Sequence, residues 1–140
     1  MRDEDERRVG AYAICRRGDD VLLVRASSRT MVPGRWFLPG GGLEFGEDPA
    51  SAVLRELREE TGLHGRDPRL VTAMTDVHTR RDGHRVCTVR LIYEVAADDG
   101  ELVFEEGGTS DEARWVPLGE VAEVGATPYV LAALGLSTPR

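Results

Sequence analysis

The chain has 140 residues and a formal net charge of −7, and every one of its 18 basic residues is an arginine, because the sequence contains no lysine. P-loop NTPases and enzymes that form a Schiff base are therefore excluded, since both classes need a lysine amine. The acidic balance also disfavours binding to nucleic acid or to an anionic membrane, because both partners require a basic face.

The length predicts one domain, which we place at residues 9–140 after a polar N-terminal tail at 1–8. The tail is not followed by the apolar segment of a signal peptide. The longest charge-free run, at 124–139, is too short and too interrupted by Gly and Pro to span a membrane. Cys15 and Cys87 show neither a disulfide framework nor a zinc-site spacing, so we expect a reduced, cytoplasmic setting.

Strand patterns dominate the first forty residues. The apolar runs 9–15 and 21–24 flank a turn-forming segment, which predicts a β-hairpin. A polar loop at 26–35 then leads to the apolar residues 36–38. Three successive glycines follow at 40–42, where the backbone must bend sharply or approach a neighbour closely.

The segment after these glycines predicts a helix. Asp48 is a suitable N-cap, Pro49 suits the first helical position, and Gly62 is a suitable stop. An apolar stripe at helical spacing would face the core; it consists of Ala50, Val53, Leu54 and Leu57.

The remaining segments alternate between strands and short helical pieces. We expect strands at 70–77, 86–95, 102–104 and 113–116, and helical segments at 118–124 and 127–136. A mixed sheet covered by helices, in the α/β class, is the natural architecture for this order.

Three carboxylates lie within one turn of the predicted helix, at Glu56, Glu59 and Glu60. Like charges at this spacing cost roughly a few tenths of a kcal/mol per pair, so something should offset them. One interpretation is a solvated helix face on which Arg55 pairs with Glu59. The other is a divalent cation, because Mg²⁺ and Mn²⁺ prefer carboxylate and carbonyl oxygens.

The wider pattern favours the second interpretation. Gly41, five residues, Glu47, seven residues and then R-E-L-x-E-E-x-G-L at 55–63 resembles the complete Nudix box. All nine specified positions match. The segment 34–42 resembles the family's lead-in to this box, and 114–118 resembles a late strand common among its members, so the likeness covers roughly residues 9–124.

The resemblance implies an α/β/α sandwich around a mixed β-sheet. It also implies Mg²⁺- or Mn²⁺-dependent hydrolysis of a pyrophosphate linkage in a nucleoside diphosphate derivative, with water attacking phosphorus. The box residues would then take the following roles: Glu59 and Glu60 as metal ligands, with Glu59 also catalytic, Glu56 as a ligand or the base, the Gly40 carbonyl as a ligand, and Arg55 as the residue that orients the carboxylates.

Candidate site residues outside the box are less well defined. On the substrate side they are Arg25, Arg35, Trp36 and Glu47, although Trp36 could equally belong to the core and Glu47 could instead support the site as an outer carboxylate. The family often adds a carboxylate from a downstream loop, for which the candidates are Glu105, Glu106, Asp111 and Glu112. We favour Glu106 as the additional metal ligand, with a solvated loop acid as the alternative.

The substrate stays open at this stage. Subfamily markers for ADP-ribose and dinucleoside polyphosphate hydrolases are missing beyond the box, where the chain reads V-H-T-R-R at 77–81. The compact length favours a nucleoside triphosphate or a modified nucleotide as a small-molecule substrate. The alternatives are a nucleotide sugar, a dinucleoside polyphosphate or an RNA cap, and, from another class, a non-catalytic nucleotide-binding regulator. A homodimer is compatible with the resemblance.

Overall fold

Two β-sheets form the framework of the computed structural model, which describes residues 5–30, 32–103 and 107–136. The first sheet has the strand order β5-β1-β7-β6. Its strands are β1 (Glu6–Ile14), β5 (Gly40–Gly42), β6 (Gly65–Thr79) and β7 (Arg85–Ala97). β1 and β7 are parallel, whereas the β1–β5 and β6–β7 pairs are antiparallel. The sheet is therefore mixed, as predicted.

The second sheet is smaller and centres on β3 (Asp20–Ala26). Its other strands are β2 (Arg16–Arg17), β4 (Trp36–Phe37) and β8 (Ser110–Pro117), all antiparallel to β3. The predicted hairpin between residues 9–15 and 21–24 is wrong in its first strand, because β3 pairs with Arg16 and Arg17 of β2, which the sequence pattern assigns to the turn. β1 lies in the first sheet instead, because its backbone pairs with β7 and β5.

Several boundaries differ from the sequence predictions. β1 begins at Glu6 because residues 6–8 pair with 86–88 of β7, so the end of the expected tail is strand. The strand expected at 102–104 is not formed at Leu102 and Val103, where the Val103 amide donates instead to the Thr61 carbonyl at 2.8 Å. Phe104 lies outside the described residues.

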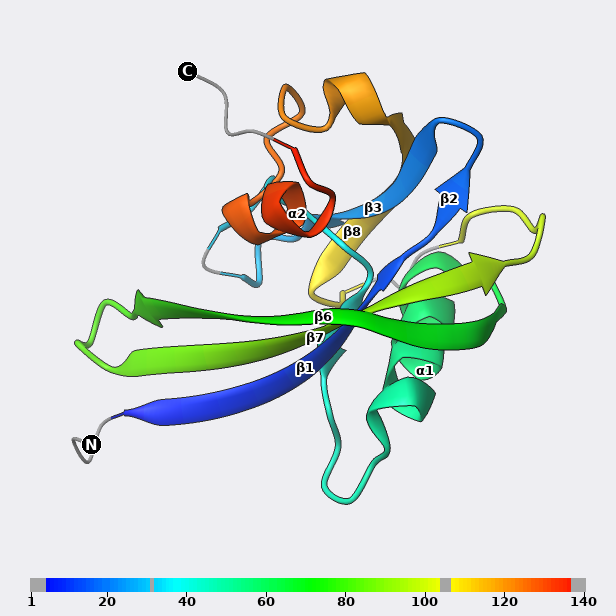
Figure 1. Ribbon diagram of the computed structural model, residues 1–140. Helices are drawn as coiled ribbons and strands as arrows, with labels where there is room; N and C mark the ends of the chain where they lie inside the picture. Colours follow the sequence, from blue (N-terminus) through cyan, green and yellow to red (C-terminus); the bar gives the residue numbers. More distant parts are fainter. Residues whose placement is uncertain (1–4, 31, 104–106, 137–140) are drawn as a thin grey trace.

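The helices cover the first sheet from two sides (Figure 1). They are α1 (Pro49–Thr61), the 3₁₀ turn η1 (Leu118–Glu120) and α2 (Pro128–Ala133). α1 packs with Ala11, Ala13 and Tyr93 in one core cluster, and α2 contributes to a second cluster that includes Ile92 and Leu23. No helix in the described ranges is both long and apolar enough to cross a membrane.

The predicted ends of α1 are confirmed. The Asp48 carboxylate accepts from the Ser51 amide at 3.4 Å, and Pro49 occupies the first turn. Gly62 ends the helix with φ +78° and donates its amide to the Arg58 carbonyl. These contacts fix the start of the helix at Pro49, directly after the loop 43–48 that follows β5.

Gly40 allows β5 to lie close against β1. A Cβ atom at this position would lie 2.3 Å from the Ala11 carbonyl oxygen, and the backbone φ is +155°. Only glycine fits this approach, which brings the start of the box alongside β1.

We therefore expect Gly40→Ala to lower the free energy of unfolding by about 3 kcal/mol or more, because backbone must move to remove the overlap. Two controls separate the clash from other effects. Gly83→Ala has φ +86° but open space and should cost about 1 kcal/mol, and Gly119→Ala, also in open space, about 0.5 kcal/mol at most. Urea unfolding of the three variants measures the order, and equal losses at Gly40 and Gly83 would show that the close approach is unimportant.

Candidate active site

A cavity of about 510 Å³ lies between the two sheets and adjoins the glycine-rich strand. One face of the first sheet supplies alternate residues to it, consistent with the two-residue period of strands. These residues are Arg8, Gly10 and Tyr12 of β1, Val86, Thr88 and Arg90 of β7, and His78 of β6. β5 and the box helix contribute Gly40–Gly42 and Glu60, so the box opens directly onto the cavity.

Glu60 is buried at the wall of the cavity, with only 8% of its surface exposed. It lies on the face of α1 that also buries Val53 and Leu57, and not on the solvated side. The Gly40 amide donates to its Oε1 at 2.7 Å. The structure thus brings Gly40 and Glu60 together through the Gly40 amide, and their role as metal ligands stays a prediction.

Burial perturbs two of the three carboxylates on α1. Burial raises the pKa of Glu60 to about 8, despite the opposing hydrogen bond from the Gly40 amide. Burial also raises the pKa of Glu56, which Arg55 partly counteracts. Both groups would therefore be stabilised in their ionised form by a nearby positive charge.

These shifts predict how stability depends on pH in metal-free protein. Because the folded pKa of Glu60 is raised above its unfolded value, its contribution is fully present below about pH 4.5 and is lost as pH rises towards 8. We expect Glu60→Gln to abolish most of this loss, which amounts to roughly 2–4 kcal/mol. Thermal unfolding in EDTA from pH 5 to 8 measures it, and parallel profiles for both proteins would contradict the assignment.

Arg55 holds the remaining carboxylates in place. Its Nε and Nη2 atoms form a fork on Glu47 at 2.7 and 2.9 Å, and its Nη1 donates to Glu56 at 3.1 Å and to Glu59 at 3.2 Å. Hydrogen bonding from Arg55 lowers the pKa of Glu47 to about 2. Glu47 is therefore a partner of Arg55, in accordance with the supporting role considered for it.

The absence of a side chain at Gly41 allows the Glu56 carboxylate to lie against β5. A Cβ atom on Gly41 would lie 2.8 Å from Glu56 Oε1, so the carboxylate packs directly against the glycine backbone. The glycine that begins the box and the carboxylates of its helix are thereby in contact.

The donor types fit a hard divalent cation. Glu56, Glu59 and Glu60 offer carboxylate oxygens from one helical turn, and two of them are desolvated without full charge compensation. Within residues 5–30, 32–103 and 107–136, however, no group of three His, Cys, Asp or Glu side chains converges closely enough to hold a metal. Arg55 occupies the position between Glu56 and Glu59, and Glu60 is bonded to Gly40.

None of the predicted substrate-side residues, Glu47 included, lines the cavity. Arg25 pairs with Asp111 at 2.7 Å, and Arg35 donates to the carbonyls of Gly125 and Ala126. Trp36 is only 5% exposed and belongs to the core, which favours its structural role.

The downstream acids are only partly placed. Glu105 and Glu106 lie outside the described residues, so the role of Glu106 stays a prediction. Asp111 and Glu112 both pair with Arg25 and do not line the cavity. Ser110, next to them, does line it, and its side chain partly opposes the rise in the pKa of Glu60.

Sequence reasoning missed two arginines of the cavity. Arg8 falls in the expected tail, yet it lies on β1 and faces the cavity. Arg90 falls in a predicted strand, and its side chain is largely buried there. An arginine within an otherwise apolar strand is a signal that could have identified Arg90.

Comparison with known proteins agrees with this geometry. The family model described as the NUDIX domain matches residues 5–133. The nucleoside triphosphatase NudI of Escherichia coli is 33% identical over 107 residues, covering 69% of this chain and 67% of that protein. The diphosphoinositol polyphosphate phosphohydrolase 3-beta of Bos taurus is 51% identical over 85 residues, covering 61% of this chain. The chain spans only 49% of that relative and 23% of Nudix hydrolase 25 from Arabidopsis thaliana.

Solved structures show the same fold. The MutT NUDIX hydrolase from Burkholderia pseudomallei superposes with a TM-score of 0.78 at 28% identity, over 95% of this chain and 99% of that one. The NUDIX domain of Shewanella oneidensis NrtR, solved in complex with ADP ribose, superposes with a TM-score of 0.72 at 21% identity, over 94% and 84% of the two chains. With the family model matching almost the whole length and the box contacts formed as described, this chain belongs to the Nudix family.

Proposed function

We propose that this protein is a pyrophosphohydrolase that uses Mg²⁺ or Mn²⁺ to cleave a pyrophosphate linkage in a nucleoside diphosphate derivative. A nucleoside triphosphate or a modified nucleotide is the preferred substrate. The similarity to a nucleoside triphosphatase over two thirds of both chains supports this preference.

The observation that carries the proposal is the position of Glu60. It is a buried carboxylate at the wall of a cavity, one turn from Glu56 and adjacent in sequence to Glu59. A pyrophosphate would be repelled by these carboxylates alone, so the site needs a cation to become attractive to its substrate.

Glu56, Glu59 and Glu60 are the residues that would hold the cation, with the Gly40 carbonyl as a further candidate. When bound, a divalent ion neutralises phosphate charge and lowers the pKa of water. The protein's own contribution is to fix the carboxylates: Arg55 binds Glu56 and Glu59, and Gly40 binds Glu60. Glu56, partly buried and held at Oε1, is the candidate base towards the attacking water.

Hydrolysis in ¹⁸O-labelled water tests the reaction directly. We expect one labelled oxygen in one of the two products, either the nucleotide or the released phosphate or pyrophosphate, and the labelled product identifies which phosphorus is attacked. The same products distinguish a nucleoside triphosphate from a nucleotide sugar, a dinucleoside polyphosphate or an RNA cap. Tight nucleotide binding without any labelled product would instead indicate a non-catalytic regulator.

A homodimer and a cytoplasmic location belong to the proposal as well. Sedimentation of the purified chain tests the first, and fractionation of the source cells tests the second.

A further inference from the structure

The cavity carries four guanidinium groups, and these differ in whether a carboxylate accompanies them. They belong to Arg8, Arg29, Arg80 and Arg90. Their pairing matters because phosphates compete with carboxylates for the same arginine fork.

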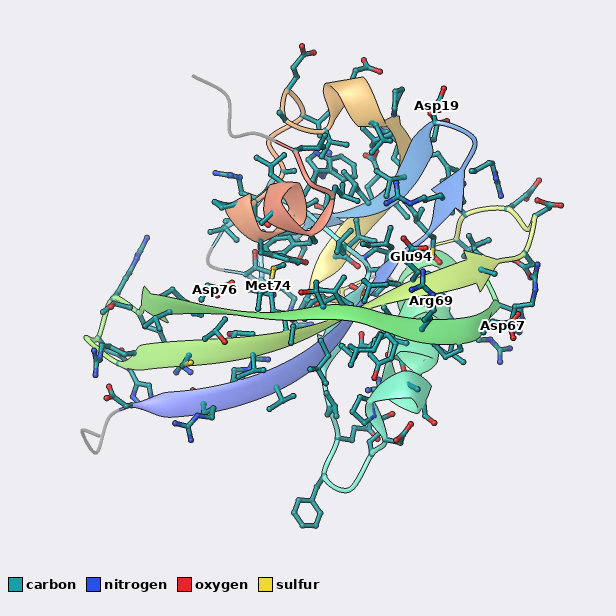
Figure 2. All side chains as sticks on the ribbon, in the orientation of Figure 1. Asp19, Asp67, Arg69, Met74, Asp76 and Glu94 are labelled. Carbon is teal, nitrogen blue, oxygen red and sulfur yellow. The ribbon has the colours of Figure 1, made fainter. Side chains whose placement is uncertain are left out.

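Arg90 already has a carboxylate partner and two aromatic neighbours. Its Nε and Nη2 atoms bind the Asp76 carboxylate at 2.8 and 3.4 Å, and its guanidinium lies 4.0 Å from the Tyr129 ring centroid and 5.0 Å from that of Tyr12. Only 11% of its side chain is exposed. Asp76 extends from β6 close to Met74, near α2 (Figure 2). Arg90 therefore contributes little net positive charge to a ligand.

Arg80 also lines the cavity and has a carboxylate partner, in a more exposed ion pair. Its Nη2 atom binds the Glu6 carboxylate, which also lies 3.9 Å from His84 Nε2. Glu6 lies on β1 and Asp76 lies on β6. Each carboxylate compensates the positive charge of one cavity arginine.

The other two arginines have no carboxylate partner among the described residues. Arg29 donates to the Gly107 carbonyl. Arg8 Nη2 lies 3.6 Å from the position that a Cβ of Gly42 would take, which places it beside the box. The guanidinium groups of Arg8 and Arg29 are therefore available to bind phosphate.

The rest of the lining is largely apolar. Val24, Val32, Phe37, Leu38 and Val86 contribute to it. Such a surface suits a planar, weakly polar group better than a ring covered with phosphates.

We propose that Glu6 and Asp76 are specificity-determining residues, which compensate Arg80 and Arg90 so that the cavity accepts nucleotides and disfavours inositol polyphosphates. The proposal rests on the proposed function and names its substrate class. It separates this chain from its diphosphoinositol polyphosphate phosphohydrolase relatives, with which it shares up to 51% identity over only part of its length.

Binding in EDTA tests the proposal without turnover. The probes are ATP and inositol hexakisphosphate, measured by calorimetry at equal, low ionic strength. Wild-type protein should bind ATP more tightly. The double variant Glu6→Gln/Asp76→Asn should gain about tenfold or more in affinity for inositol hexakisphosphate relative to ATP, because the probe with more charge gains more from each freed arginine.

Glu94→Gln is the matched control. Glu94 is 40% exposed, as against 41% for Glu6 and for Asp76, and it pairs with Arg16 and Arg69. It lies towards the other end of the long sheet from Asp76 (Figure 2). This variant should leave the affinity ratio unchanged. Glu6→Gln alone alters an exposed pair and should shift the ratio part of the way if the double variant fails to fold.

Two results would overturn the proposal: a wild-type protein that binds inositol hexakisphosphate more tightly than ATP, or variants at Glu6 and Asp76 with the affinity ratio of the Glu94 control. A protein that shows the expected ratio but hydrolyses neither class would instead refute the proposed hydrolase function, so the two failures are distinguishable.

Discussion

Glu60→Gln is expected to lower kcat about a thousandfold, which corresponds to a loss of about 4 kcal/mol in transition-state stabilisation. The glutamine keeps the size of the side chain and an oxygen for the Gly40 amide, but it removes the negative charge offered to the cation. Glu59→Gln should give a loss of similar order. Initial rates with Mg²⁺ and with Mn²⁺ measure both variants.

Glu123→Gln is the control for this prediction, because Glu123 is exposed and does not line the cavity. It should retain the wild-type rate. A Glu60→Gln protein that stays folded and turns over at the wild-type rate would refute the role of Glu60. Unfolding in EDTA distinguishes this from misfolding, since removal of a buried charge should not destabilise the protein at pH 8.

Arg55→Ala should have the second-largest effect, because one guanidinium organises Glu47, Glu56 and Glu59. We expect kcat to fall about a hundredfold or more, and the free energy of unfolding to fall by about 2 kcal/mol as neighbouring carboxylates lose their partner. Arg55→Lys should recover stability better than activity, since an ammonium keeps the charge but cannot form the fork on Glu47.

Arg58→Ala provides the comparison on the same helix. Arg58 is exposed, and its side chain forms no ion pair with any of the described residues. Its loss should leave kcat unchanged and alter stability by about 0.5 kcal/mol at most. If Arg55→Ala changed kcat and the free energy of unfolding no more than Arg58→Ala does, the Arg55 hydrogen bonds would contribute neither to catalysis nor to stability.

Local features were predictable from the sequence. The ends of α1 follow from Asp48, Pro49 and Gly62, because capping depends on residues within one turn. The carboxylate set was also predictable, because helical spacing alone places Glu56, Glu59 and Glu60 within one turn.

Partners distant in sequence were not predictable. The hydrophobic pattern of residues 9–15 is compatible with pairing to either neighbouring strand, and only the whole sheet determines that β1 pairs with β7. For the same reason the sequence pattern alone assigns Arg8 to the N-terminal tail and not to β1. The burial of Glu60 depends on β5 lying against α1, which no local pattern encodes.

The most direct test of a metal-dependent pyrophosphohydrolase is hydrolysis across a panel of nucleoside triphosphates and modified nucleotides, with Mg²⁺, with Mn²⁺ and with EDTA. Folded wild-type protein should cleave at least one of these nucleotides when either ion is present and none in EDTA, and Glu60→Gln should lose that activity while Glu123→Gln keeps it. Absence of hydrolysis with both ions, or turnover that persists unchanged in EDTA, would contradict it.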